Sequence, residues 1–363
     1  MDWVTRIWAA QEKINEKIGR NVYPYIVPEA YCGWVPAPER TNAFLNGNRY
    51  YADRLTLRSL PGRDLPAKKN SNCPRVLLVG DSNIHGDETD FEECWVTQLD
   101  KILGEDYEII NGGVPGYGID QAFWRSKALV EKLMPDIVVL GFAACDLTRQ
   151  VNMLRLLRSA ETDVPFLKPI YVSENGKIRK IEIPEATITN FAEIFSDVGA
   201  QNLLSRYDYY FSDSKASLFD SHLRRSIQLA AKFVVPENCP AEILKKVISF
   251  WAPSQSIEIT LRIMERFGSW CLSNQVTPVI MLLPLQPNFA RFNSYNFIYS
   301  YFQKAMPRLG IPFVDPKPKL VDKKFIDSRF WHKGGHLNAE GSRAFSMVVA
   351  EALPNVLETK GIV

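Results

Sequence analysis

Five short apolar runs constrain the fold of this chain more than any other feature. They read RVLLVG (75–80), YEIING (107–112), DIVVLGF (136–142), PVIMLLP (278–284) and IPFVDP (311–316). Runs of this length and apolarity are typical of strands buried on both faces of a parallel sheet. Amphipathic helical patterns separate or follow them at residues 91–103, 121–133 and 339–357. Strands that alternate with helices predict a three-layer α/β fold around a five-stranded parallel sheet.

Two parts of the chain fall outside this alternation. Residues 1–70 contain a helical pattern and then a stretch rich in Pro, Tyr and Trp, which predicts an N-terminal helix and an extended wrap. Residues 151–275 separate the third and fourth strands and predict a long, mainly helical insertion. The insertion contains a hairpin that turns at Glu174-Asn175-Gly176. We expect residues 71–150 and 276–363 to form the core, with the insertion inside the same domain.

Charge and composition exclude several classes of partner. The net charge is +2, and no Lys/Arg cluster is interleaved with aromatic residues, so we expect no nucleic-acid partner. No apolar segment is long enough to span a membrane, and the N-terminus lacks the pattern of a secretory signal. Six cysteines without a CxxC pair indicate free thiols. We therefore predict a cytoplasmic protein with no metal or organic cofactor, and leave the oligomeric state open.

The residues that follow the strands are the candidates for chemistry, because parallel sheets bind ligands outside the carboxyl ends of their strands. Gly80-Asp81-Ser82-Asn83 follows the first run and places Ser82 in the first turn of a helix. Backbone N–H groups and the helix dipole stabilise negative charge there. A serine at this position is either a nucleophile or a helix cap, and Asp81 is an equally good cap.

Two further segments join this candidate. The glycine-rich NGGVPGYGIDQ (111–121) follows the second run, and Gly113 is placed to direct its N–H at an oxyanion, although an ordinary turn would also use glycine. HLNAEG (336–341) places His336 where the last helix begins. A neutral imidazole at that junction can take the proton of Ser82; the alternative is a histidine that only forms local hydrogen bonds.

With these three segments the chain resembles the SGNH hydrolases, also called the GDSL esterase/lipase superfamily. The blocks that carry the resemblance are GDSNIHG (80–86), NGGVPGYG (111–118) and HLNAEG (336–341), and it covers residues 75–150 and 276–352. The resemblance implies a flavodoxin-like sheet and a covalent acyl-serine on Ser82. It also implies His336 as the base, Gly113 as an oxyanion donor, and a small-molecule acyl ester or acyl donor as the partner.

The third block of the family departs from its usual form here. It normally reads Gly-x-Asn-Asp, and the asparagine gives a further oxyanion hydrogen bond. In this chain the segment is AACD (143–146), so Cys145 stands at the asparagine position. A thiol is a weak donor. We therefore expect Cys145 to be a poor replacement in the oxyanion hole.

The acid that orients the histidine is also missing from its usual place. The family carries it two or three residues before the histidine, where this chain has Gly334 and Lys333. We expect Asp327 to orient His336 instead, with Asp315 or a backbone carbonyl as alternatives.

Four further residues are candidates for substrate contact, namely Asp81, Asn83, Tyr117 and His332. The leading hypothesis is a serine esterase. One alternative is an acyltransferase that passes the acyl group to a sugar or natural-product acceptor. The other is a non-catalytic binding or scaffold protein, which Cys145 and the missing acid would suit.

Overall fold

The computed structural model describes residues 3–63, 73–159, 162–184, 198–212, 239–249, 252–290 and 293–359. The chain divides into two compact units: Met1–Leu65 with Arg149–Leu218, and Pro66–Thr148 with Phe219–Val363. The first unit contains the predicted wrap and the first part of the predicted insertion, and the predicted domain boundaries stay a prediction. The boundary expected at residues 70–71 lies outside the described residues.

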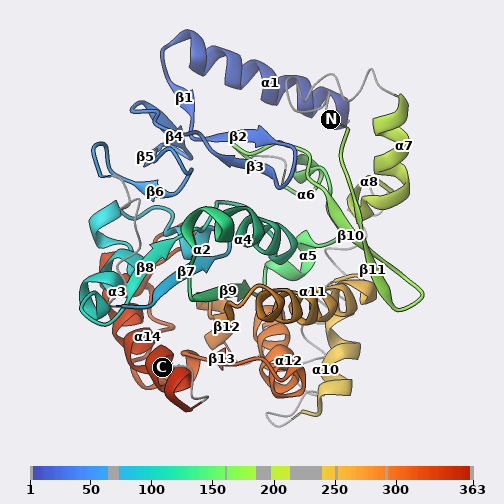
Figure 1. Ribbon diagram of the computed structural model, residues 1–363. Helices are drawn as coiled ribbons and strands as arrows, with labels where there is room; N and C mark the ends of the chain where they lie inside the picture. Colours follow the sequence, from blue (N-terminus) through green and yellow to red (C-terminus); the bar gives the residue numbers. More distant parts are fainter. Residues whose placement is uncertain are drawn as a thin grey trace. The chain divides into compact units, whose positions relative to one another are not determined.

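The second unit contains the predicted five-stranded parallel sheet. Its strands are β7 (Arg75–Val79), β8 (Glu108–Asn111), β9 (Ile137–Ala143), β12 (Thr277–Leu283) and β13 (Phe313–Val314) (Figure 1). Their order is β13-β12-β9-β7-β8, which is the flavodoxin-like order when read from the β8 edge. The fold class predicted from the apolar runs is therefore confirmed. The last strand is only two residues long because Pro312 and Pro316 flank its run, and proline is tolerated at a sheet edge.

Helices cover both faces of this sheet and make three layers. On one face, alternate strand residues such as Val76, Val139 and Val279 form a buried core with side chains of three helices. Those helices are α3 (Trp95–Leu103), α13 (Lys317–Asp322) and α14 (Ala339–Thr359). On the other face lie α4 (Ile119–Leu133), α11 (Ser254–Ser273) and α12 (Ser294–Leu309) (Figure 1). There Phe142 of β9 packs against Phe302 of α12, with ring centroids 4.5 Å apart.

The helices predicted between the strands are confirmed, with small changes at their ends. A 3-10 turn, η1 (Phe91–Glu93), precedes α3. The remaining short elements in or beside this unit are α2 (Ser82–His85), α5 (Asp146–Arg149), α10 (Ala241–Ile248), η4 (Gln286–Phe289) and η5 (Ser328–Phe330). Of these, α2 matters most below, because it carries Ser82.

The first unit begins with α1 (Trp3–Gly19), and the predicted wrap forms short strands. A four-stranded sheet has the order β1-β4-β5-β6, and β2 pairs with β3. These strands are β1 (Tyr23–Pro24), β2 (Ile26–Glu29), β3 (Gly33–Pro36), β4 (Ala43–Leu45), β5 (Asn48–Ala52) and β6 (Arg58–Ser59). The described part of this unit also contains the helices α6 (Arg155–Arg158), α7 (Val198–Tyr207) and α8 (Tyr209–Ser212).

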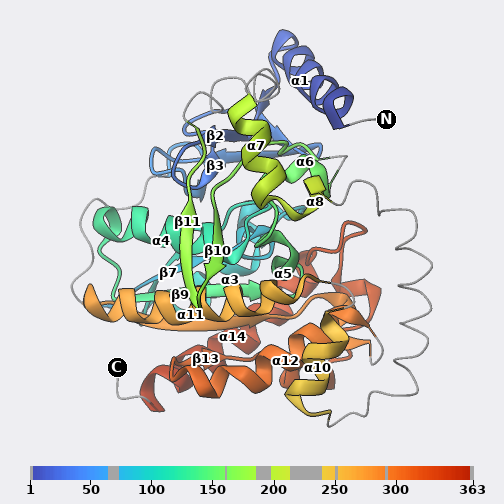
Figure 2. The ribbon, with the colours of Figure 1, turned by 90° about the vertical axis from the view of Figure 1, so that its right-hand side faces the viewer.

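The predicted hairpin is present in the first unit. It consists of β10 (Ile170–Glu174) and β11 (Lys177–Ile181), which lie side by side in Figure 2. Asn175 and Gly176 both have positive φ, as the two central residues of a type I′ turn require. The Asn-Gly pair therefore fixes this turn locally.

All six cysteines are free thiols, as their spacing predicts. Among the described residues, no helix combines the length and the apolarity needed to cross a bilayer. The cytoplasmic location stays a prediction.

Candidate active site

The candidate site forms where the strand order of the sheet changes direction. β7 has β8 on one side and β9 on the other, and this is the point at which open α/β sheets bind ligands. The segment after β7 carries Ser82, and the segment after β9 carries Cys145. The carboxyl ends of both strands lie at one edge of the sheet, because the two strands are parallel.

Ser82 is held by a one-turn helix that is locked onto the sheet. Ile84 of α2 is fully buried. A Cβ atom added at Gly80, Gly113 or Gly141 would overlap the Ile84 side chain, so these glycines form its socket. The socket, rather than the dipole of a four-residue helix, fixes the position of Ser82.

Asp81 is the cap of this helix. Its carboxylate accepts a hydrogen bond from the Asn83 backbone N–H at 2.9 Å, and it is 1% exposed. The Asn83 side chain also donates to Asp81, at 2.9 and 3.0 Å. The capping role that was the alternative for Ser82 is therefore filled by Asp81. The predicted substrate contacts of Asp81 and Asn83 are not supported by these side-chain hydrogen bonds.

Ser82 and His336 lie within hydrogen-bond distance although 254 positions separate them. The distance from Ser82 Oγ to His336 Nε2 is 2.8 Å. The other ring nitrogen, His336 Nδ1, is 2.7 Å from Glu88 Oε2. A carboxylate beside Nδ1 accepts a hydrogen bond from the Nδ1–H and so favours the tautomer in which Nε2 accepts from the serine hydroxyl.

The pKa values of the histidine and the glutamate move in opposite directions. Burial favours the neutral imidazole of His336, but the Glu88 hydrogen bond and the negative charges of Asp87, Glu88 and Asp81 outweigh it and raise its pKa. The hydrogen bond from His336 lowers the pKa of Glu88, against a smaller opposing effect of burial. The pair therefore favours a glutamate carboxylate beside a histidine that can take up a proton.

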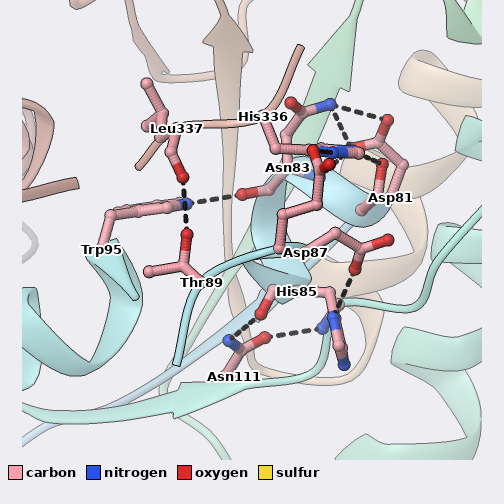
Figure 3. A network of polar contacts seen from close by, with 12 residues as sticks. Asp81, Asn83, His85, Asp87, Thr89, Trp95, Asn111, His336 and Leu337 are labelled. Carbon is pink, nitrogen blue, oxygen red and sulfur yellow. Dashed lines mark hydrogen bonds and ion pairs between the residues drawn. The ribbon is translucent and has the colours of Figure 1, made fainter. Parts of the chain in front are cut away.

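A side-chain hydrogen bond between Thr89 and Leu337 joins the loops of Glu88 and His336 (Figure 3), and a backbone hydrogen bond closes the segment that precedes His336. Thr89 Oγ1 donates to the Leu337 carbonyl at 2.6 Å. The His332 N–H donates to the His336 carbonyl at 2.7 Å. Thus the residues next to Glu88 and next to His336 are bonded to each other.

The prediction that Asp327 orients His336 is wrong. The Asp327 carboxylate caps η5 by accepting from the Arg329 N–H at 3.0 Å. Asp315 accepts from the Tyr299 hydroxyl at 2.5 Å and the Gln303 amide at 2.6 Å, which leaves it engaged elsewhere. Glu88 was missed because sequence spacing does not show which residue of a loop turns toward a distant histidine. The only signal was an acidic pair, Asp87-Glu88, shortly after the serine.

The prediction for Gly113 is also not supported, because its peptide group is fixed at both ends. The Gly113 N–H donates to the Asn111 side chain at 3.0 Å. The carbonyl of the same peptide group, from Gly112, accepts from Arg125 Nε at 2.7 Å. An oxyanion would have to displace Asn111 to receive the Gly113 N–H.

Cys145 directs its thiol at carboxylates. Its Sγ lies 3.6 Å from Asp81 Oδ2 and 3.8 Å from Asp146 Oδ1. Ligand atoms of these three residues come within 4.8 Å of one another, a spacing that a metal ion could use. Asp81 and Asp146 also accept backbone N–H groups, from Asn83 and Ala143, so hydrogen bonding accounts for the arrangement. The thiol is thus engaged with the two carboxylates, and its predicted weakness as an oxyanion donor stays a prediction.

The remaining candidates have different environments. Tyr117 is fully buried, so it does not contact a substrate in this conformation. His332 is half-buried, and its charge contributes to the lowered pKa of Glu88, which places it beside the site. His85, which follows Ser82 closely, is fully buried and pairs with Asp87 at 2.6 Å.

No protein-family model and no curated protein sequence matches this chain. Solved structures with a similar fold include "TesA" at 13% identity, TM-score 0.42, covering 78% of this chain and 99% of its own. The esterase EstA from Pseudoalteromonas sp. matches at 12% identity, TM-score 0.39, with coverages of 78% and 99%. A putative lipolytic protein of the G-D-S-L family from Desulfitobacterium hafniense DCB-2 matches at 11%, TM-score 0.35, with 77% and 98%. These include the group that the sequence blocks resemble, but such low identities and TM-scores do not extend the neighbours' activities to this chain.

Proposed function

We propose that this chain is an ester hydrolase in which Ser82 is the nucleophile and His336 the general base. One observation carries the proposal: Ser82 Oγ is 2.8 Å from His336 Nε2, while His336 Nδ1 is 2.7 Å from Glu88. A hydroxyl, an imidazole and a carboxylate joined in this order activate a serine for attack on an acyl carbon.

The first half of the reaction forms an acyl-enzyme. As Ser82 Oγ bonds to the acyl carbon, its proton passes to His336 Nε2, and the imidazolium then protonates the departing alcohol. Water repeats these steps on the ester of Ser82 and restores the free serine. The raised pKa of His336 has a consequence for pH: the base works only when neutral, so activity rises as the pH increases through that pKa.

The oxyanion formed during attack needs hydrogen-bond donors. Ser82 is the first residue of α2, so its N–H has no partner within its own helix and can serve as a donor. Gly113 and Cys145 are engaged with Asn111 and Asp81 respectively. Because each missing donor costs about 100- to 1000-fold in turnover, we expect a slow esterase.

The two alternatives differ in what they require of this site. An acyltransferase uses the same acyl-serine and only changes the acceptor, so the geometry serves it equally. A non-catalytic scaffold has no need for a serine, histidine and carboxylate within hydrogen-bond distance of one another. That geometry favours catalysis over the scaffold.

The test uses short p-nitrophenyl esters and a fluorophosphonate probe. We expect the natural chain to hydrolyse the ester and to be labelled, and Ser82→Ala to lose both. His336→Ala should slow both by at least about 1000-fold, because the hydroxyl then lacks its base. Ser328→Ala, which removes an exposed hydroxyl of the histidine-bearing segment, is the control and should leave both unchanged.

Undiminished labelling of Ser82→Ala would remove Ser82 as the nucleophile and with it the proposal. Adding alcohols or sugars to the assay separates transfer from hydrolysis. If the acyl group is transferred to an acceptor in preference to water, the protein is an acyltransferase on the same site.

A further inference from the structure

We propose that Glu88 is the positioning residue of this site and that it occupies a space which Gly334 leaves open for it. In this arrangement the carboxylate comes from the loop after the nucleophile, not from the segment before His336. The inference rests on the proposed function of Ser82 and His336, and it adds where the third member comes from and what makes room for it.

The first line of support is steric. A Cβ atom added at Gly334 would overlap both carboxylate oxygens of Glu88. The carboxylate therefore lies against the backbone of the histidine-bearing segment, two residues from His336. The three atoms nearest to that added Cβ all belong to the Glu88 carboxyl group, so a side chain at position 334 would compete with this carboxylate for the same space.

The second line of support is the backbone at Glu88. Its φ is +65°, a left-handed conformation that residues other than glycine and asparagine adopt rarely. Strained backbone of this kind persists only where surrounding contacts determine it, and it concentrates at functional sites. Here the contacts are the His336 ring on Glu88 itself and the Leu337 carbonyl on its neighbour Thr89.

The third line of support is that the other nearby carboxylates are engaged elsewhere. Asp87 pairs with the buried His85 at 2.6 Å, and Asp81 caps α2. Both still act on His336 through their charge, and His332 acts on Glu88. Glu88 is the carboxylate in hydrogen-bond distance of Nδ1, so it determines the tautomer and the orientation of the ring.

The first experiment removes the negative charge and keeps the shape. Glu88→Gln should lower kcat/KM about 100- to 10,000-fold and slow fluorophosphonate labelling in parallel. It should also move the acidic limb of the pH–rate profile to lower pH, because the negative charge that helps to raise the pKa of His336 is gone even if the amide oxygen still accepts from Nδ1–H. A residue that only maintained the fold would leave that limb in place. Asp90→Asn, an exposed acid of the same loop, and Asp327→Asn are matched controls and should stay within about twofold.

The second experiment moves the carboxylate across the gap. Gly334→Asp in the natural background should lose activity, because the new side chain collides with Glu88. The double variant Glu88→Ala, Gly334→Asp should be at least about tenfold more active than Glu88→Ala alone, because the aspartate carboxylate can enter the space that the glutamate carboxylate has left. Gly334→Asp would then be harmful in the natural chain and helpful beside Glu88→Ala. That reversal is expected only if the two side chains occupy the same space.

The outcomes separate this inference from the proposed function. If Ser82→Ala abolishes labelling while Glu88→Gln keeps the natural kcat/KM and pH profile, Glu88 has no positioning role and the inference is overturned. If Ser82→Ala is still labelled, the proposed function fails first. Should the double variant not fold, as thermal unfolding would show, the Glu88→Gln pH profile alone decides.

Discussion

Two loops lie beside Ser82, and the sequence pattern favours the wrong one as the source of a catalytic contact. The glycine-rich loop after β8 attracts attention because glycines let a backbone approach a ligand, yet the peptide group between Gly112 and Gly113 is held inward by Arg125 and Asn111. The loop after α2 has an ordinary composition, yet it delivers Glu88 to His336. The comparison shows that glycine richness reports close packing, and here the close neighbour of Gly113 is α2 rather than a substrate.

The largest expected effect tests that interpretation of the glycine-rich loop. A Cβ at Gly113 would overlap the His85 backbone nitrogen and lie 2.8 Å from the Ile84 carbonyl carbon, and backbone atoms have little freedom to shift. We expect Gly113→Ala to lower the free energy of unfolding by about 3 kcal/mol. Urea denaturation measures this.

The matched control is Gly310→Ala. Gly310 has φ +67° and open space around the added atom, so only backbone strain opposes alanine and the cost should be about 1 kcal/mol. A Gly113→Ala protein of natural stability whose activity alone is lost would reverse the comparison and return Gly113 to the oxyanion hole.

The next effect concerns the residue that holds the same peptide group from the other side. Arg125 is 3% exposed, and its Nε donates to the Gly112 carbonyl. Arg125→Met keeps the volume but leaves a buried carbonyl without this donor, which should cost about 2 kcal/mol. Lys132→Met, an exposed change on the same helix, should alter the free energy of unfolding by less than about 0.5 kcal/mol, and urea denaturation measures both variants. Equal effects of the two substitutions would show that Arg125 does not support the loop.

The parts of this protein that were predictable are those governed by local pattern. Apolar runs with few polar side chains identified all five strands of the sheet, and Asn175-Gly176 identified the hairpin turn. The serine and histidine were predictable because each follows a recognisable element at the same edge of the sheet. Glu88 was not predictable, because its role depends on the left-handed turn after Gly86 and on the space beside Gly334. Neither feature produces a repeating pattern in the sequence.

A smaller effect is expected from strengthening the oxyanion hole at Cys145. The thiol has one proton, and Asp81 lies 3.6 Å from its sulfur. An asparagine amide has two N–H groups, so one can remain on Asp81 while the other turns to the oxyanion. We expect Cys145→Asn to raise kcat about tenfold on p-nitrophenyl acetate, with KM changed little. Cys145→Ala should match the natural chain; a large loss in that variant would show that the thiol itself is a donor.

The smallest effect separates the strain at Glu88 from its chemistry. Glu88→Ala and Glu88→Gly both remove the carboxylate, so both should lose activity to the same extent. Alanine must adopt φ +65° at a cost that glycine does not bear, so Glu88→Gly should be the more stable of the two by about 1 kcal/mol. Chemical denaturation of the two variants, run in parallel with the esterase assay, measures both quantities.

The pair works because its members share every lost contact and differ only in backbone freedom. Equal stability would mean that the loop relaxes out of its left-handed turn once Glu88 no longer contacts His336, so the contact itself holds the turn. A stability difference combined with equal inactivity would mean that the loop keeps its shape without the carboxylate. In that case the 86–90 loop, like the glycine-rich loop beside it, is built first by its own packing and the active carboxylate is added to a preformed turn.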